Sequence, residues 1–198
     1  MNEITANISL SINPHITTFT GRKVNPLHLR VEDVCIEDIA HALACTNRFC
    51  GHTKEPISIA QHSVFVAKLC RGEKFELQAL LHDASEAYLG DITKWLKQTP
   101  EFQGYRDAEA HAQAVIFSVF DCALELAPEV EAADRLMVRY EADWSGIEIL
   151  HPEYPAPTIL EKLMIGQWEP WPWQTAETVF LSEFEGLYHA PEVTLREA

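Results

Sequence analysis

The chain is poor in basic residues and contains no long apolar run. Its 198 residues include 15 Lys and Arg against 30 Asp and Glu, which gives a formal net charge of −15 at pH 7. Because nucleic-acid binding needs clustered Lys and Arg to contact phosphates, this balance argues against a general nucleic-acid binder, although one local site can still bind a small anion. No run approaches the roughly 18 apolar residues of a membrane span, so we expect no membrane association.

Export signals, disulfide patterns and several common catalytic motifs are also missing. The N-terminus, MNEITANISLSINPH, lacks the basic and apolar regions of a secretory signal, so we expect a soluble, cytoplasmic protein. The five cysteines are an odd number without a CxxC pair, which predicts reduced thiols. Without a GxxxxGK(S/T), GxGxxG, HExxH or GxSxG motif, P-loop, Rossmann, zincin and nucleophile-elbow chemistries lack the residues that carry them.

Apolar residues recur mostly at helical spacing, which predicts an all-α fold. The 47% hydrophobic content suits one core, so we expect a single domain over residues 1–198. A short strand-like start with a turn at Gly21 is predicted at 16–24, and the Pro- and Trp-rich stretch 151–173 is predicted to be irregular. The predicted helices span 31–44, 58–70 with Ser58 and Gln61 as a capping box, 75–90 closed by Gly90, 91–97 with Asp91 as N-cap, 105–126, 128–144 with Pro128 at its start, and 175–189.

The stretch LLHDASEAYLGD, residues 80–91, places several ionisable groups in an apolar segment. In a helix, residues three and four apart share a face, so Glu86 is predicted to lie beside His82 and Asp83. Carboxylates are seldom buried unless they are paired or bind a metal, and an imidazole beside a carboxylate suits Mn, Co, Fe or Zn. The alternative is a solvated helix face with ordinary surface charges.

A mononuclear metal site needs three or four ligands, so this group requires partners on other helices. His62 lies in an apolar helix between Ile59 and Val66, and Asp134 precedes the apolar run LMV. Each residue alone is more often a core or boundary residue. Together they form a series, H…HD…D, with contributions from three predicted helices.

This series resembles the signature of the HD-domain metal-dependent phosphohydrolases. The flanks AQHSVFVA, LLHDASEAYLGDITKWLK and EAADRLMVRYEAD resemble small members of the 5′-deoxynucleotidase type. The segments TFTGRKVNPLHLRVEDVCIEDIAHAL and RFCGHTKEPISIAQHS resemble phage and prophage members, which include deoxyadenosine triphosphate triphosphohydrolases. The resemblance implies one HD domain with its core at about 17–145, followed by an irregular segment and a helix at 150–190.

The resemblance also implies roles for individual residues. Glu86 matches the catalytic glutamate that orients or deprotonates the attacking water, or it only fixes a ligand. Asp91 matches an aspartate that touches the sugar hydroxyl, and as a helix N-cap it would have a structural role. The implied ligands of a divalent ion (Mn, Co, Zn or Mg) are His62, His82, Asp83 and Asp134. Such an ion polarises a phosphoryl oxygen and lowers the pKa of bound water to about 7.

The segment Asn47-Arg48-Phe49 resembles an Asn-Arg-Trp motif of the nucleotidases. Arg48 would contact phosphate, where its guanidinium can pair in a bidentate way, and Phe49 would lie against the sugar. Because Phe49 stands where the nucleotidases have Trp, the sequence does not predict whether ribonucleotides are excluded. His52 and Lys94 are further candidates for phosphate or leaving-group contacts, or they are ordinary surface residues.

We therefore expect an enzyme that cleaves the 5′ phosphoester of a deoxynucleotide, with deoxyadenosine nucleotides favoured. The products would be a deoxynucleoside plus phosphate or triphosphate. The alternatives are a non-catalytic regulatory protein that binds a nucleotide or metal, and a signalling-nucleotide phosphodiesterase. Relatives form dimers or hexamers, so a homo-oligomer is expected, with the Trp-rich segment 168–173 as an interface or a lid on the core.

Overall fold

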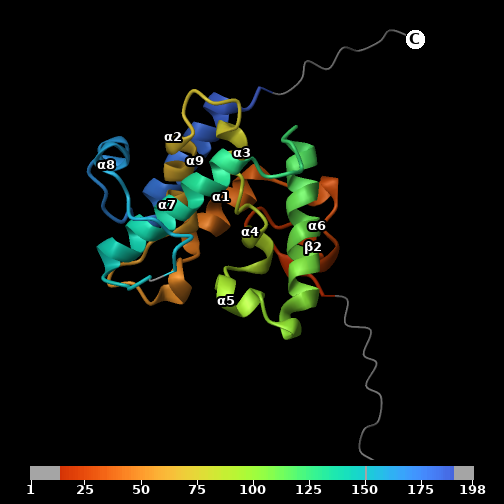
Figure 1. Ribbon diagram of the computed structural model, residues 1–198. Coiled ribbons are helices and arrows are strands. Elements are labelled where there is room, and N and C mark those ends of the chain that lie inside the picture. The colour runs from red at the N-terminus through yellow and green to blue at the C-terminus, as the bar shows by residue number, and fades with distance from the viewer. Residues whose placement is uncertain (1–13, 150, 190–198) are drawn as a thin grey trace, which may run out of the picture.

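The computed structural model describes residues 14–149 and 151–189, and it confirms the all-α prediction (Figure 1). Short 3-10 turns occur at Pro26–His28 (η1), Val31–Asp33 (η2), Phe49–Gly51 (η3) and Pro100–Phe102 (η4). The strands are β1 (Ile16–Thr17) and β2 (Lys23–Val24). The helices are α1 (Ile36–Cys45), α2 (Ile59–Leu69), α3 (Glu76–Leu80), α4 (Glu86–Leu89), α5 (Lys94–Lys97), α6 (Gln103–Val119), α7 (Pro128–Ser145), α8 (Ile159–Ile165) and α9 (Trp173–Leu187).

The two strands form a hairpin within the predicted strand-like stretch at 16–24. They pair in antiparallel register, with Ile16 opposite Val24. Gly21 has a φ of 86°, a left-handed conformation that glycine adopts without strain. Thr20 donates to the buried carboxylate of Asp38 through its backbone N–H at 2.7 Å and its hydroxyl at 2.9 Å. These bonds attach the hairpin to α1.

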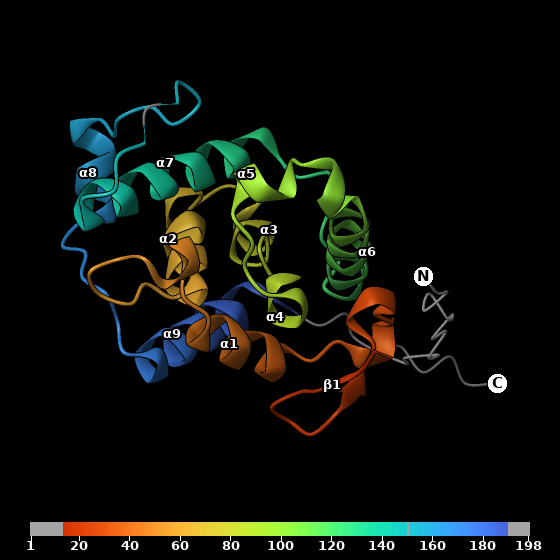
Figure 2. The ribbon, with the colours of Figure 1, turned by 90° about the horizontal axis from the view of Figure 1, so that it is seen from below.

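Helix α2 is the central element of the bundle. Figure 2 shows it between α7 on one side and α1 and α9 on the other, and it contacts all three. Its first turn is capped by Ser58, whose hydroxyl accepts from the Gln61 N–H at 3.1 Å. Every residue from Ile59 to Ala67 is buried. A polar side chain on such a helix must therefore be hydrogen-bonded, which constrains His62.

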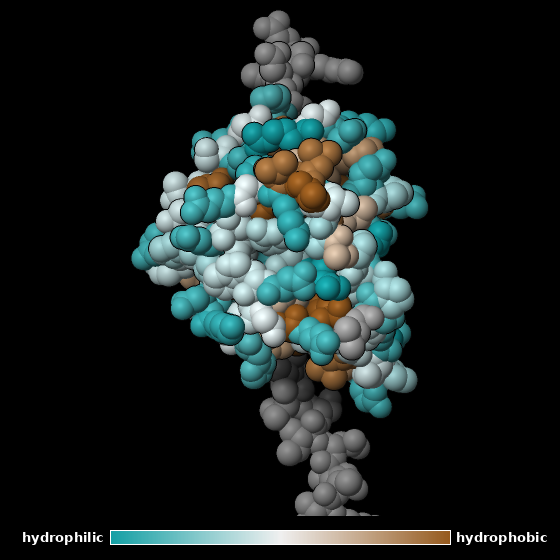
Figure 3. Space-filling model, turned by 60° about the vertical axis from the view of Figure 1, so that its left-hand side comes forward, coloured by the Kyte–Doolittle hydropathy of each residue, from teal (hydrophilic) through white to brown (hydrophobic). Residues whose placement is uncertain are grey.

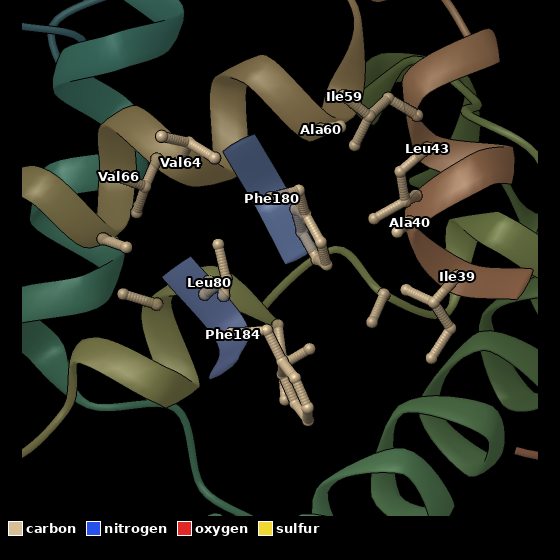
Figure 4. Close-up of a cluster of buried hydrophobic side chains, with 14 of the residues drawn as sticks. Ile39, Ala40, Leu43, Ile59, Ala60, Val64, Val66, Leu80, Phe180 and Phe184 are labelled. Carbon is tan, nitrogen blue, oxygen red and sulfur yellow. The ribbon is translucent and has the colours of Figure 1, made fainter. Parts of the chain in front are cut away.

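The apolar core lies where α1, α2, α3 and α9 meet (Figure 4). Phe180 and Phe184 of α9 face Ile39 of α1 and Leu80 of α3, and all four are buried. Burying one such side chain contributes about 1.5–3 kcal/mol. This packing makes the C-terminal helix part of the same core as the helices that hold the candidate site.

The predicted single helix over 75–90 is wrong, because α3 ends at Leu80 and α4 begins at Glu86. In an unbroken helix, the Ser85 N–H would donate to the Leu81 carbonyl. In the structure, the side-chain amide of Gln113 from α6 bridges the Ser85 N–H and the Leu81 carbonyl instead. It accepts from the Ser85 N–H at 3.0 Å and donates to the Leu81 carbonyl at 2.7 Å. Gln113 thus stabilises a turn over residues 81–85, which contains His82 and Asp83.

Three further boundaries differ from the sequence predictions. Asp91 is not an N-cap, because α5 begins only at Lys94, after Thr93. Helix α6 ends at Val119, and Asp121 follows in a left-handed conformation with a φ of 56°. The first turn of the predicted helix at 31–44 is the 3-10 turn η2, and α1 begins at Ile36.

The stretch 151–173 is not wholly irregular, because it contains α8. Thr158 and Glu161 form a capping box at its start, with the Thr158 hydroxyl accepting from the Glu161 N–H at 3.3 Å. Helix α8 exposes Ile159 and Leu163, which are 81% and 72% exposed. Figure 3 shows apolar patches on an otherwise largely hydrophilic face of the molecule.

Other predictions agree with the described residues. Gly90 ends α4 with a φ of 81°, Pro128 begins α7, and all five cysteines are free. None of the helices in 14–149 and 151–189 has the length and apolar composition needed to cross a bilayer. The first 13 residues, for which the sequence predicts no secretory signal, lie outside the described residues.

Candidate metal centre and pocket

The four predicted ligands converge where α2, the turn 81–85 and α7 meet. His62 Nε2 lies 3.1 Å from Asp134 Oδ1, and His82 Nε2 lies 3.2 Å from Asp83 Oδ2. The ligand atoms of His62, His82 and Asp83 all lie within 4.8 Å of one another. Both imidazoles are buried, at 0% and 4% exposure, whereas the Asp83 and Asp134 side chains are 24% and 34% exposed. The centre is therefore closed on the histidine side and accessible on the aspartate side.

Both histidines have an acceptor at Nδ1. His62 Nδ1 lies 3.0 Å from Glu141 Oε1, and His82 Nδ1 lies 2.8 Å from the Ala79 carbonyl. Because a carbonyl and a carboxylate only accept, each Nδ1 carries a proton, so Nε2 is the nitrogen that faces the centre and would bind a metal after losing its own proton. His82 Nε2 is buried and makes no hydrogen bond to the described residues. Two imidazole nitrogens and two carboxylates form a donor set that fits Mn, Co, Fe or Zn.

The histidines and the aspartates of this centre shift each other's pKa values. Burial lowers the pKa of His82, but the charge of Asp83 and the interactions with Asp134 together outweigh burial and raise that pKa well above its ordinary value. Burial raises the pKa of Asp134, but the close contacts with His62 and His82, together with the charges of these histidines, outweigh it and lower the pKa well below the ordinary range. The carboxylates therefore stay ionised and attract positive charge, for which protons and a divalent cation would compete.

Glu86 begins α4 beside this centre and is 6% exposed. Its Oε1 accepts from Lys97 Nζ at 3.2 Å, and its buried Oε2 has no hydrogen-bond partner among the described residues. Burial, followed by the charges of Asp83 and Asp91, raises the pKa of Glu86 well above its ordinary value. A buried carboxyl group with a raised pKa in a pocket is typical of a general acid or base.

A pocket of about 450 Å³ contains Glu86 and both aspartates of the centre in its wall. This volume suits a small-molecule ligand. Its wall also includes the basic residues Arg48, Lys94 and Lys97 and the aromatic residues Phe49, Trp95 and Tyr154. The pocket thus combines cationic groups with flat apolar surfaces next to the candidate metal centre.

Arg48 is buried between two carboxylates. Its Nε donates to Glu141 Oε2 at 2.8 Å, and its Nη1 lies 3.4 Å from Asp83 Oδ2. The next residues, Phe49 and Cys50, have φ values of 54° and 51°. Such left-handed conformations of non-glycine residues cost about 1–3 kcal/mol each and are common at ligand sites. The bend places Arg48 and Phe49 together in the pocket wall.

The other predicted contacts have different outcomes. Asp91 lines the pocket, and burial raises its pKa. Lys94 also lines the pocket, but it pairs with Glu153 at 2.9 Å and lies 5.3 Å from the centre of the Tyr154 ring. His52 is exposed and is not among the residues that line the pocket. The structure therefore does not bring His52 to the site.

Two residues of the site were not predicted from the sequence. Glu141 follows Asp134 by seven residues, so the two share a face of α7, and this spacing could have identified it. Lys97 contacts Glu86 and Glu109 only because the chain turns between Gly90 and Thr93 and brings α5 back over the pocket. No local pattern in the sequence indicates that contact.

The fold and this donor set define an all-α protein with a candidate metal centre. No protein-family model matches the chain. Over 133 residues it is 34% identical to YfdR, an uncharacterised protein of Escherichia coli, covering 67% of this chain and 73% of YfdR. Over 136 residues it is 35% identical to an uncharacterised protein of Rhodobacter capsulatus, covering 63% of this chain and 69% of that protein. The chain belongs to the same family as YfdR.

Proposed function

We propose that this protein is a metal-dependent phosphohydrolase of the HD type that cleaves the 5′ phosphoester of a deoxynucleotide. The products are a deoxynucleoside plus phosphate or triphosphate. The observation that carries the proposal is the convergence of two histidines and two aspartates at the wall of a pocket that also contains Glu86 and Arg48. The H…HD…D order of these ligands supports the same class.

Each group in the pocket has a chemical role in this reaction. His62, His82, Asp83 and Asp134 would hold a divalent ion, which would supply polarisation of the phosphoryl oxygen and acidification of water. Arg48 balances the charge of the phosphate, and its fixed guanidinium orients it. Glu86 removes a proton from the attacking water, and its raised pKa suits proton transfer near neutral pH.

The remaining contacts determine which nucleotide is accepted. Asp91 and Phe49 both line the pocket, and the resemblance to the nucleotidases supports a contact of Asp91 with the sugar hydroxyl and of Phe49 with the face of the sugar. Trp95 and Tyr154 present aromatic surfaces in the same pocket, and planar bases stack on such surfaces. Deoxyadenosine nucleotides are the expected preference, and the protein is expected to act as a homo-oligomer, which sedimentation can test.

A substrate panel tests the reaction. Ribo- and deoxynucleoside mono- and triphosphates are incubated with Mn, Co, Zn or Mg, and the products are separated by chromatography. Glu86→Gln, purified in the same way, controls for contaminating phosphatases. A preference for another base would remove the deoxyadenosine detail alone. Measurable nucleotide binding and full metal occupancy without turnover would favour a regulatory binding protein.

Hydrolysis in oxygen-18 water identifies the bond that breaks. Attack at the α-phosphorus places the label on the phosphate or triphosphate and leaves the deoxynucleoside unlabelled. Label in the nucleoside hydroxyl would contradict attack at phosphorus. Release of pyrophosphate with a nucleoside monophosphate would mean that a different bond is cleaved, and mass spectrometry distinguishes these outcomes.

A further inference from the structure

Glu141 is a fully buried carboxylate with two partners from distant parts of the chain. Its side chain on α7 is 0% exposed. Oε1 binds His62 Nδ1 at 3.0 Å, and Oε2 accepts from Arg48 Nε at 2.8 Å. One side chain therefore contacts both a candidate metal ligand and the candidate phosphate-binding residue.

The contact with His62 determines which ring nitrogen faces the centre. Because the carboxylate only accepts, His62 donates from Nδ1, so Nε2 is the nitrogen that faces Asp134, 3.1 Å away, and Asp83, 3.9 Å away, and that can bind a metal once its proton is displaced. A glutamine at position 141 would have one amide oxygen for two donors. If its NH₂ group faced His62, the proton would move to Nε2 and block ligation.

The contact with Arg48 fixes the guanidinium. Arg48 is buried, and its other close carboxylate, Asp83, is itself a candidate metal ligand at 3.4 Å. Without Glu141, Arg48 would lose its shortest ion pair and its Nε acceptor. The guanidinium would then be free to turn toward Asp83 and compete with a metal for that carboxylate.

We propose that Glu141 is a positioning residue that couples the metal centre to the phosphate-binding arginine. Its carboxylate holds His62 as a metal ligand and Arg48 as an anion-binding group at the pocket wall. The inference rests on the proposed function for the role of Arg48. It requires that loss of Glu141 weakens binding of the metal and of the anion together, whereas an ion pair that only supports the fold would change stability alone.

Calorimetric titration with Mn²⁺ tests whether loss of Glu141 weakens metal binding. Glu141→Gln should weaken Mn²⁺ binding about 10- to 100-fold, the range for partners of metal-bound histidines, and Glu141→Asp should recover part of the loss because it keeps the charge. The matched control is Glu131→Gln on the same helix, since Glu131 is 51% exposed and pairs only with Arg135 among the described residues. It should bind Mn²⁺ as the unaltered protein does.

A second pair of variants keeps the test informative if Glu141→Gln alone unfolds the protein. Glu141→Gln leaves Arg48 buried without its partner, whereas Arg48→Met combined with Glu141→Gln removes both charges. Relative to Arg48→Met alone, the double variant should still bind Mn²⁺ at least about tenfold more weakly. Inorganic triphosphate, titrated into the Mn²⁺-loaded proteins, should bind more weakly to Glu141→Gln than to the unaltered protein. Between Arg48→Met and the double variant, triphosphate binding should differ little.

The outcomes separate this inference from the proposed function. Equal Mn²⁺ affinity with and without Glu141 in both backgrounds would overturn the inference, whatever the activity. The expected affinity changes in a protein that hydrolyses no deoxynucleotide would support the role of Glu141 and overturn the proposed substrate. If the unaltered protein binds no divalent ion, both fail.

Discussion

His82 uses its ring nitrogens differently from an ordinary core histidine, whereas both ring nitrogens of His62 are hydrogen-bonded. Each binds an acceptor through Nδ1 and directs Nε2 at carboxylates of the pocket wall. A core histidine that serves packing alone would normally have both nitrogens hydrogen-bonded, but His82 Nε2 is not. The unsatisfied, buried nitrogen is the strongest single-residue argument for a metal ligand.

Removing one ligand should remove the metal. We expect the purified protein to carry about one divalent ion per chain, and His82→Ala or Asp83→Ala to lose both ion and activity, because the remaining ligands hold it poorly. Elemental analysis by mass spectrometry measures the ion. His28→Ala, an exposed histidine on η1, is the control. Unchanged stoichiometry in both ligand variants would place the site elsewhere.

Glu86 should affect turnover rather than metal content. Glu86→Gln keeps the size of the side chain and an oxygen for Lys97, but it cannot accept a proton from water. We expect kcat to fall at least about a hundredfold, the usual scale for general acid–base groups, while the ion and substrate binding remain. Because protonation inactivates a base, kcat of the unaltered protein should fall as pH drops through the raised pKa of Glu86. Equal loss of metal would instead make Glu86 a residue that fixes a ligand.

At the scale of elements, the segment after α8 is tied to α2 beside the metal centre. Gln61 Nε2 donates to the Glu169 carbonyl at 2.7 Å, and Gln61 Oε1 accepts from the Trp171 N–H at 2.9 Å. Trp168 is 4% exposed and packs edge-on against Trp144, whereas Trp173 is 44% exposed. Trp168 is thus part of a lid on the core, and an oligomer interface at 168–173 stays a prediction.

Gln61→Ala tests this attachment. Gln61 is fully buried and satisfies two backbone groups of the Trp-rich segment, so its loss should lower the free energy of unfolding by about 2–3 kcal/mol without removing the metal. Chemical denaturation with metal analysis measures both effects. Gln103→Ala, an exposed glutamine on α6, should change stability by less than about 0.5 kcal/mol. A similar loss in the two variants would refute a specific role for Gln61.

The sequence predicts most helices but not the details that shape the site. Ser58, Gly90 and Pro128 mark helix ends through local chemistry, so those boundaries agree with the structure. The break at 81–85 depends on Gln113, a residue about thirty positions later, and no window around His82 contains that information. The residues of the α8 capping box, Thr158 and Glu161, are present in the sequence, but the surrounding prolines favour an irregular segment.

The same distinction holds for the site. The four predicted ligands form a pattern in the sequence, and the structure brings their side chains together. His52, a further candidate for a phosphate or leaving-group contact, is exposed and outside the pocket wall, and the positive φ values at Phe49 and Cys50 just before it are not indicated by sequence spacing. The contacts of Glu141 and Lys97 join different elements, so they emerge only from the packed structure.

At the scale of the whole molecule, the chain has an excess of negative charge, and several of its carboxylates gather in the pocket. The net charge is −15, and the carboxylates of Asp83, Glu86, Asp91 and Asp134 share one pocket. Burial, followed by charge repulsion, raises the pKa values of Glu86 and Asp91, so their ionised forms oppose folding, whereas the neighbouring histidines keep the pKa values of Asp83 and Asp134 low. A bound divalent cation would relieve this repulsion in the folded state alone.

A divalent cation should therefore stabilise the whole fold. At a free concentration about 100 times its Kd, an ion that binds only the folded state adds about 2.7 kcal/mol, which should raise the Tm by about 5–10 °C for a chain of this size. Scanning calorimetry in about 0.15 M salt, where general screening is already strong, measures the shift. A chelator should reverse it, and His82→Ala should abolish it while Glu131→Gln retains it. An equal rise of the Tm in His82→Ala would show that the cation acts on the overall negative charge and not at the centre formed by His62, His82, Asp83 and Asp134.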